Sequence, residues 1–256
     1  MKKLLLLFAG VFIGIVSFAQ MPKVRNDPTH DDKPLHFGFS LGINTMDFHI
    51  RQSQTGVDSF IVADVAHLQP GFHVHAISNL RLAENFDLRF TPGISFGGER
   101  QIQYSEFRVA NRLIDSADIP VIVESNFLEF PLIIKYKSKR LNNFRPFLIG
   151  GFNTRVDLAA TKKTWGRSKK ENNLVLVNPL DFYYELGFGM DFYLQYFKFA
   201  IELKYSVGLT NVLRTRIKKN GPDGTYYDPP PPEDAIFTDV IDRMNSRMFM
   251  ISFHFE

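Results

Sequence analysis

The sequence contains no cysteine. Without thiols the chain can form neither a disulfide nor a thiolate metal site, and attachment as a lipoprotein, which needs a cysteine, is excluded. Packing and hydrogen bonding alone must therefore stabilise the fold.

Long apolar runs and a strong net charge are also missing. After residue 19 no uninterrupted apolar run approaches the roughly 18 residues of a transmembrane helix, so no such helix is expected. The formal net charge is +3, and removal of Lys2 and Lys3 with the N-terminal segment lowers it to +1, because 3 − 2 = 1. This balance argues against nucleic acid as a partner.

The first 19 residues have the pattern of a signal peptide. Two lysines precede an apolar core from Leu4 to Val16, and the segment ends in Ser17, Phe18 and Ala19. Small residues at the last and third-last positions are typical of a signal-peptidase site, so we predict export with cleavage of residues 1–19. Residues 20–34 are polar and contain three prolines, which predicts a flexible periplasmic lead-in.

The remaining chain is rich in strict alternation. In the stretch 180–209, apolar residues recur at every second position through residue 194, and the pattern resumes at residue 197 after a short break at Gln195 and Tyr196. A period of two indicates strands, and two strands joined by a tight turn form a hairpin. Each strand is long enough, once tilted, to cross a bilayer.

Six further segments alternate in the same way, which gives eight strands. Pro92 falls within one of them, and because proline cannot donate to a ladder we expect a local bulge there. The predicted strands cover residues 35–48, 68–80, 86–96, 127–137, 144–157, 180–194, 197–209 and 247–256.

Short and long connections alternate along these strands. The links at 81–85, 138–143 and 195–196 are short, whereas residues 47–67, 97–126, 158–179 and 211–246 form long connections. We therefore predict an all-β fold over residues 35–256: an eight-stranded antiparallel up-and-down transmembrane β-barrel with short periplasmic turns and long extracellular loops. A soluble β-sandwich, the alternative, needs neither strands of this length nor all long loops at one end.

The inward parity of the predicted strands carries charges of both signs. An eight-stranded barrel leaves a lumen just wide enough for side chains, so we expect a plug of hydrogen-bonded ion pairs rather than an open pore. The predicted lumen residues are Asp87, Arg89, Glu129, Lys135, Arg145, Arg155, Asp181, Glu185, Asp191, Lys198, Glu202 and Lys204.

Four inward histidines, His36, His73, His75 and His254, fall on strands that barrel closure makes neighbours. A metal site is geometrically conceivable, and hydrogen bonding to lumen carboxylates is the alternative. No fixed ligand set stands out, so we expect no metal and no cofactor. The predicted lipid-facing positions carry no Ser, His and acid constellation, so we expect no enzyme activity.

Two of the long connections have compositions suited to binding a partner, and a solvated loop is the alternative for each. The segment 162–170, KKTWGRSKK, surrounds the single tryptophan with cations and suits an anionic headgroup or an acidic protein. The run of prolines at 229–232 favours a stiff arm that presents two tyrosines. The predicted contact residues are Lys162, Lys163, Trp165, Arg167, Lys169, Lys170, Tyr226, Tyr227, Pro229 and Pro230.

Three blocks of the sequence resemble the PorT (SprT) barrel of the type IX secretion system of Bacteroidetes-type bacteria: LHFGFSLGINTMDF, ENFDLRFTPGISFGGER and ESNFLEFPLIIKYKSKRLNNFRPFLIGG. The resemblance covers most of the chain after the signal peptide and is strongest from residue 35 to 157. It implies a non-enzymatic outer-membrane component required for export of proteins with C-terminal sorting domains. Its implied partners are outer-membrane lipid and other secretion-system subunits, without a small-molecule substrate.

Architecture alone leaves a second function open, a general structural or adhesive surface barrel of the OmpA/OmpX kind. One feature departs from the usual barrel pattern. Barrels commonly end on an aromatic residue, whereas here Phe255 is followed by Glu256. We therefore expect the insertion machinery to recognise Phe253 and Phe255 in a shifted frame.

Overall fold

The computed structural model describes residue 26 and residues 33–52, 60–68, 70–107, 116–160, 177–213 and 241–256. The predicted signal peptide, residues 1–19, lies outside the described residues, as does most of the lead-in at 20–34. In the described part of the chain, no helix is long and apolar enough to cross a membrane.

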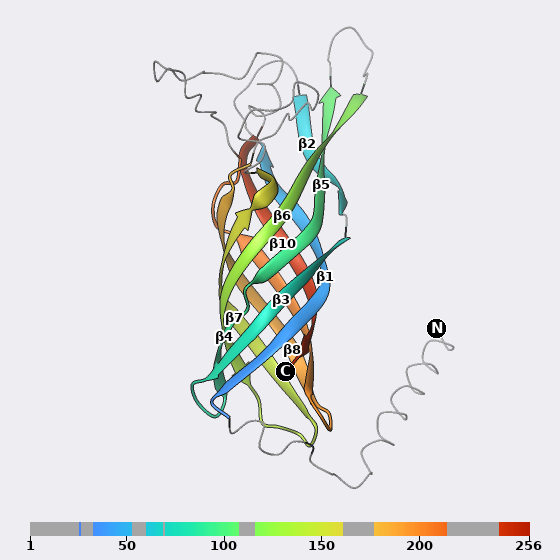
Figure 1. Ribbon diagram of the computed structural model, residues 1–256. Helices are drawn as coiled ribbons and strands as arrows, with labels where there is room; N and C mark the ends of the chain where they lie inside the picture. Colours follow the sequence, from blue (N-terminus) through green and yellow to red (C-terminus); the bar gives the residue numbers. More distant parts are fainter. Residues whose placement is uncertain are drawn as a thin grey trace, which may run out of the picture.

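The described residues form one antiparallel sheet that closes on itself (Figure 1). Neighbours around the wall are β1, β10, β9, β8, β7, β6, then β4 with β5, then β3, which pairs with β1 again. The strands are β1 (Leu35–Gln52), β2 (Phe60–Leu68), β3 (Pro70–Arg81), β4 (Phe86–Phe90), β5 (Gly93–Phe107), β6 (Ser116–Lys137), β7 (Phe144–Asp157), β8 (Leu180–Tyr193), β9 (Lys198–Gly208) and β10 (Ile241–Phe255).

β4 and β5 occupy a single position in the wall, because both lie between β3 and β6. The wall therefore has eight positions, and the predicted eight-stranded antiparallel up-and-down barrel is confirmed. Closure leaves the wall itself without a free edge along the paired segments, which removes the usual site of edge-to-edge aggregation.

The bulge predicted at Pro92 is wrong. The pairing register passes through Pro92 without a shift on either side, and the Pro92 carbonyl still accepts the N–H of Ala76 at 2.9 Å. The register shifts instead between Ser95 and Gly98, where Gly97 has φ 80°. A left-handed backbone costs glycine little, so the extra residue is accommodated at the glycine rather than at the proline.

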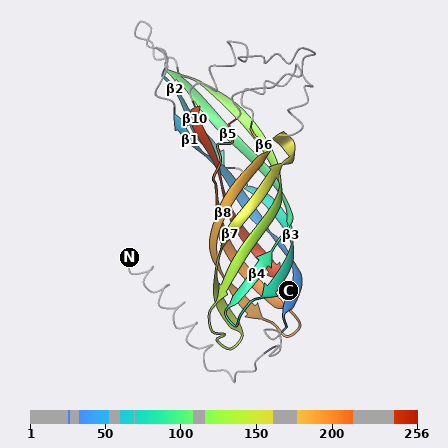
Figure 2. The same ribbon diagram turned by 90° about the vertical axis from the view of Figure 1, so that its left-hand side faces the viewer.

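Two predicted long loops, 47–67 and 97–126, consist largely of strand. β5 and β6 stay paired as far as Phe107 opposite Ser116, and β2 pairs with β5 from Phe60 to Leu68. These strands continue past one end of the wall (Figures 1 and 2). Between residues 97 and 107 polar residues occur at both odd and even positions, so the sequence shows no alternation. Backbone hydrogen bonds to the neighbouring strands hold this segment as a strand, and the alternation pattern could not predict it.

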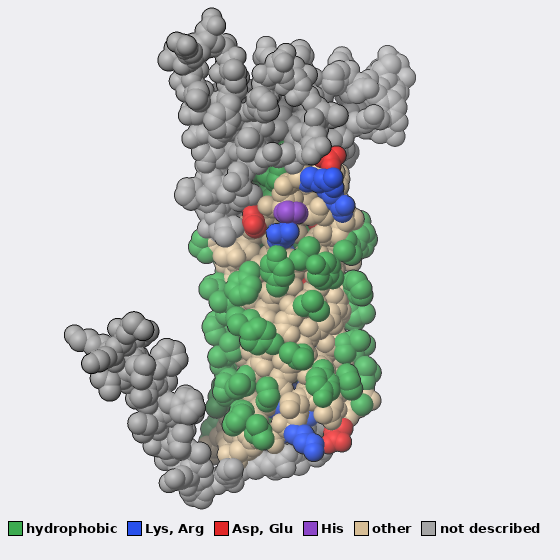
Figure 3. Space-filling view, turned by 180° about the vertical axis from the view of Figure 1, so that it is seen from behind, with side chains coloured by type: hydrophobic (Ala, Val, Ile, Leu, Met, Phe, Trp, Pro, Cys, Tyr) green, Lys and Arg blue, Asp and Glu red, His purple; other side chains and the backbone are tan. Residues whose placement is uncertain are grey.

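The two faces of the wall differ as an outer-membrane barrel requires. Outward residues are apolar and exposed, with Phe152 at 69% and Phe37 at 68%. On the face seen in Figure 3, apolar side chains cover the middle of the wall and charged side chains lie near its two ends. Inward residues are mainly polar or charged and buried, so the protein has its polar side inside.

The short connections, 82–85, 138–143 and 194–197, lie at one end, here named the turn end, together with the start of β1 and the end of β10. The opposite end is named the loop end. Asn26 is held at the turn end: its N–H donates to Asn143 Oδ1 at 3.0 Å, and its side-chain amide donates to the Tyr193 carbonyl at 3.0 Å. At this residue the lead-in is attached to the barrel rim.

Candidate functional site

The barrel interior near the turn end contains an ion-pair cluster that joins opposite walls. Arg89 on β4 contacts Glu202 on β9 and the side chain of the terminal Glu256, each at 3.0 Å. Lys198 at the start of β9 also pairs with Glu256. Because guanidinium and carboxylate groups match in shape, Arg89 can serve two acids at once and fix β4 against β9.

Two more pairs complete this turn-end cluster. Lys135 Nζ lies 2.7 Å from Asp191 Oδ1, and Lys137 Nζ lies 2.6 Å from Asp87 Oδ1. The Lys135 ammonium also lies 3.7 Å from the centre of the Phe147 ring, which faces into the lumen. Each buried cation here therefore has a carboxylate or aromatic partner, as burial of charge requires.

A second ion-pair cluster lies midway along the barrel. Arg155 on β7 contacts Glu185 at 2.9 Å and Glu129 at 3.5 Å, and Lys204 Nζ lies 3.1 Å from Glu185. The Asn153 amide donates to both carboxylates, at 3.0 and 2.8 Å. Two acids and two cations balance each other, so this mid-barrel cluster fixes β6, β7, β8 and β9 together without a net charge.

Arg100, nearer the loop end, is held differently. Its guanidinium donates to Ser246 Oγ at 2.7 Å and to Ser125 Oγ. Its Cζ lies 3.7 Å from the centre of the Phe48 ring and 5.6 Å from that of Phe127. This cation is therefore stabilised by hydroxyl groups and aromatic faces.

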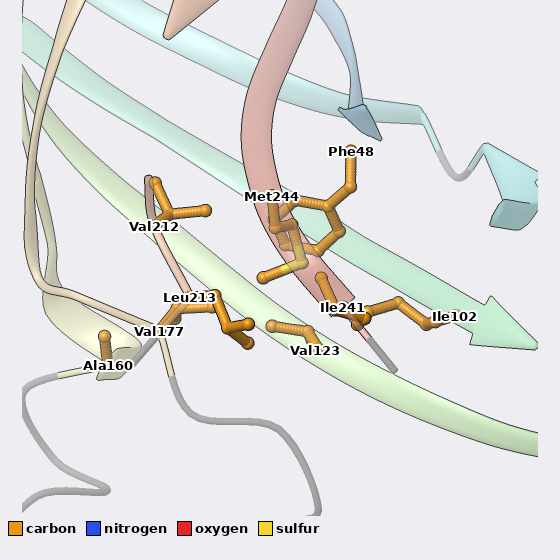
Figure 4. Close-up of a cluster of buried hydrophobic side chains, with 9 residues drawn as sticks. All are labelled: Phe48, Ile102, Val123, Ala160, Val177, Val212, Leu213, Ile241 and Met244. Carbon is orange, nitrogen blue, oxygen red and sulfur yellow. The ribbon is translucent and has the colours of Figure 1, made fainter. Parts of the chain in front are cut away.

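Two apolar groups close the loop end of the lumen. The methionine layer consists of Met46, Phe127, Met248 and Met250. Beyond it lies the apolar cap, whose side chains converge from several strands and loops (Figure 4). The cap consists of Phe48, Ile102, Val123, Ala160, Val177, Val212, Leu213, Ile241 and Met244.

Local hydrogen bonds position the loop segments that contribute to the cap. Asp157 Oδ1 accepts the N–H groups of Ala159 and Ala160, at 2.9 and 3.2 Å, and so caps the helical turn at 158–160. Val177 and Leu213 form an isolated antiparallel bridge that brings two long connections together. The cap therefore rests on defined backbone contacts.

The inward histidines lie beside polar partners rather than around one point. His73 Nε2 lies 2.9 Å from Ser252 Oγ, His75 lies 3.5 Å from Glu129, and His254 lies 3.6 Å from Glu202. Within the described ranges, no group of three or more His, Cys, Asp or Glu side chains could hold a metal ion.

The structure places every predicted lumen residue inside the barrel. All twelve are at most 5% exposed: Asp87, Arg89, Glu129, Lys135, Arg145, Arg155, Asp181, Glu185, Asp191, Lys198, Glu202 and Lys204. The predicted partner-contact residues lie outside the described residues: Lys162, Lys163, Trp165, Arg167, Lys169, Lys170, Tyr226, Tyr227, Pro229 and Pro230.

Sequence reasoning omitted several interior residues from this set, among them Lys137, Asn153, Glu256 and Arg100. Lys137, Asn153 and Glu256 have the inward parity of their strands, so alternation could have identified them. Arg100 lies in a segment that was expected to be a loop, and no sequence signal marked it. The Glu256 side chain is an interior counter-ion of Arg89 and Lys198.

The filled interior is suited to holding the wall rigid. The Arg89–Glu202 ion pair crosses the lumen, the pairs of the mid-barrel cluster join neighbouring strands inside it, and apolar side chains fill its loop end, so the arrangement provides no wide channel through which a folded protein could pass. Any binding of macromolecules must therefore use the outer surfaces and the two ends of the barrel.

A family model described as outer membrane protein beta-barrel domain matches residues 18–214 of this chain. Among solved structures, the chain is similar to the crystal structure of the outer membrane protein OprG from Pseudomonas aeruginosa, with 13% sequence identity and a TM-score of 0.35. That alignment covers 86% of this chain and 93% of the OprG chain. A search of curated proteins finds no match.

Proposed function

Since the chain belongs to the family of outer membrane protein beta-barrel domains, we propose that it is a non-enzymatic component of the type IX secretion system. In this role it is required for secretion of cargo with C-terminal sorting domains. Its signal peptide is removed on export, and its partners are outer-membrane lipid and other subunits of the machine.

The filled lumen is the observation that supports an accessory or assembly role. The buried Arg89–Glu202 pair crosses the interior, the Arg155–Glu185 pair joins neighbouring strands within it, and the apolar cap occupies its loop end. A barrel filled in this way does not conduct cargo itself. The resemblance of three sequence blocks to the PorT family supports the choice of secretion system.

The extension formed by β2, β5 and β6 provides the surface for such a role. Beyond the wall, residues 116–126 of β6 pair with β5 alone among the described strands. Pro120 lies in this part, where a residue that cannot donate to a second neighbour is tolerated. We propose that this extension contacts the other subunits.

A general structural or adhesive surface barrel is the second candidate. Family membership and a rigid, ion-paired interior support it equally well, because neither depends on a secretion partner. The two candidates differ in one measurable respect, the fate of cargo with C-terminal sorting domains.

The test is deletion of the gene in its native host, followed by quantification of such cargo in the periplasm and the medium. The proposal expects accumulation in the periplasm that a plasmid copy reverses. Unchanged secretion would reject the type IX role and favour the general surface barrel, while the barrel fold would stand.

A shortened variant tests the extension itself. Residues 103–120 are replaced by Asn-Gly between Ile102 and Val121, which are paired partners, so that a two-residue turn closes the hairpin. Arg100, Ile102 and Val123 are retained, and the wall is unchanged. The proposal expects an assembled barrel that fails to restore secretion; full restoration would show that the extension is not the contact surface.

A further inference from the structure

The inner wall formed by β3, β1 and β10 contains buried polar atoms that lack hydrogen-bond partners. Among the described residues, no partner is found for Ser40 Oγ, for either end of the Asn44 amide, for His73 Nδ1 or for His254 Nδ1. All four side chains are at most 3% exposed. Buried polar groups are nearly always satisfied by protein or by ordered water, so these atoms need an explanation.

Strand register brings these groups together. Ser40 lies opposite both His75 on β3 and His254 on β10, and two residues further along β1 Gly42 lies opposite both His73 and Ser252. Neighbouring strands are about 4.8 Å apart, and inward positions on one strand recur every 6–7 Å or so. The unpartnered groups therefore follow one another along a single strip of the wall.

Because Gly42 has no side chain, the His73 ring can extend across β1 at this position. A Cβ atom at residue 42 would lie 2.6 Å from His73 Nε2, and that nitrogen lies 2.9 Å from Ser252 Oγ on β10. With Nε2 occupied by the serine hydroxyl, His73 Nδ1 remains available. Similarly, a Cβ at Gly71 would lie 2.6 Å from Asn44 Oδ1, so the Asn44 amide lies over a glycine.

The opposite wall differs in its hydrogen bonding. Glu185 Oε1 accepts hydrogen bonds from Asn153, Arg155 and Ser206, all within 2.9 Å, and Glu129 accepts from Ser95 and Asn153. Each of these carboxylates thus accepts at least two hydrogen bonds from side chains, and Glu185 Oε2, which accepts none, lies 3.1 Å from Lys204 Nζ. The strip on β3, β1 and β10 has hydrogen-bond donors and acceptors, but no protein group bridges them.

Above the strip the lumen becomes apolar. The next inward residue of β1 after Asn44 is Met46, which belongs to the methionine layer, and Phe48 of the apolar cap follows. Apolar constrictions exclude water, whereas a buried water needs two to four polar partners. The strip offers the polar partners that a buried water needs. The methionine layer is an apolar constriction that excludes water.

We propose that the wall of β3, β1 and β10 binds a file of water molecules beside Ser40, Asn44, His73 and His254. The methionine layer and the apolar cap, rather than the ion pairs, are the barrier to passage of water and small polar solutes through the barrel. The barrel is thus a closed but hydrated path, a property independent of its role in secretion.

The first test detects the water in the unaltered protein. In the isotope-labelled barrel refolded in micelles, nuclear Overhauser contacts between water and the side-chain amide of Asn44 are expected. The Asn153 amide is the matched control within the same lumen, because it already donates to Glu129 and Glu185, and it should show none. Equal behaviour of the two amides would overturn the proposed water file.

The second test locates the barrier by stopped-flow measurement of osmotic water permeability in proteoliposomes. Replacing Met46, Met250 and Met244 with serine is expected to raise permeability several-fold, because methionine sites tolerate substitution and serine can hydrate the constriction. Adding Asn44→Leu should return permeability to the wild-type level. The double variant Lys204→Met, Glu185→Gln, which removes the ion pairs of Glu185 with Lys204 and with Arg155, should leave permeability unchanged.

Assembly of each variant is checked by the mobility of unheated protein in denaturing gels. If the ion-pair variant becomes permeable while the serine variant stays closed, the barrier lies in the ion pairs and the proposal is wrong. If the serine variant conducts water but Asn44→Leu has no effect, the path does not follow the β3, β1 and β10 wall.

Discussion

The two faces of β8 differ more than the two faces of an ordinary strand. Glu185 is fully buried and paired with Arg155, whereas its neighbours Leu186 and Phe188 are each 58% exposed. In a soluble protein the charged face would be outside. The difference shows that this wall is built for a solvent that cannot hydrogen-bond, so most charges between its two ends are turned inward and paired with an opposite charge.

Each face depends on the other. Lipid satisfies no polar group, which forces the carboxylates inward, and the narrow lumen of an eight-stranded barrel brings them within reach of cations on other strands. There Arg155 on β7 and Lys204 on β9, the two strands that flank β8, meet Glu185. A substitution that leaves a charge without a partner on either face should therefore destabilise the barrel. The size of the loss should depend on whether the charge lies in the lumen or against lipid.

The largest effect is expected when the inner face loses one partner. Arg155→Met leaves Glu129 and Glu185 without their shared cation, and removal of one member of a buried ion pair costs about 3–5 kcal/mol. The free energy of unfolding in lipid vesicles, from urea titration followed by circular dichroism, measures this loss.

Arg243→Met is the matched control, because Arg243 is exposed near the loop end and should tolerate the change within about 0.5 kcal/mol. Adding Glu129→Gln to Arg155→Met should recover much of the stability, since Glu185 still pairs with Lys204 and the cluster is again without a net charge. Similar losses for Arg155→Met and Arg243→Met would show that the inner face does not depend on pairing.

The outer face is tested by the reverse change. Leu186→Arg places a cation against lipid in the middle of β8 and should cost about 2–4 kcal/mol in the same titration. Phe144→Arg, at the first residue of β7 beside a short turn, should cost only about 0–1 kcal/mol because interfacial headgroups and water are near. Equal costs at the two depths would contradict the lipid-facing assignment.

The sequence predicted this inside-out arrangement because alternation has a period of two and needs no knowledge of partners. Parity alone assigned Glu129, Arg155 and Glu185 to the interior. Parity does not say which acid meets which cation, since Arg89 lies 113 residues from Glu202 along the chain and their contact depends on barrel closure. The bulge was misplaced for a related reason, because Gly97 combines a positive φ with close approach to Gly71, which no local pattern reveals.

The last two residues, Phe255 and Glu256, lie on opposite faces of the wall. Phe255 faces outward and stacks on Phe39 with ring centres 5.0 Å apart, whereas the Glu256 side chain is fully buried between Arg89 and Lys198. Its backbone also pairs with that of Lys198, with the Glu256 N–H donating at 2.9 Å. The last residue thus belongs to the ladder and to the ion-pair cluster.

Glu256→Gln should give the smallest of the three effects, a loss of about 1.5–3 kcal/mol, because the amide keeps the shape but weakens hydrogen bonds that involve two charged partners. Glu84→Gln, at an exposed turn residue near the same rim, is the control and should change little.

Deleting Glu256 distinguishes a role in the stability of the folded barrel from a role in its insertion into the membrane. If the terminal aromatic is what the insertion machinery recognises, the deletion variant should reach the membrane as well as the parent yet unfold at lower urea. A deletion variant that is inserted poorly but is equally stable once refolded would assign Glu256 to recognition rather than to the ion-pair cluster.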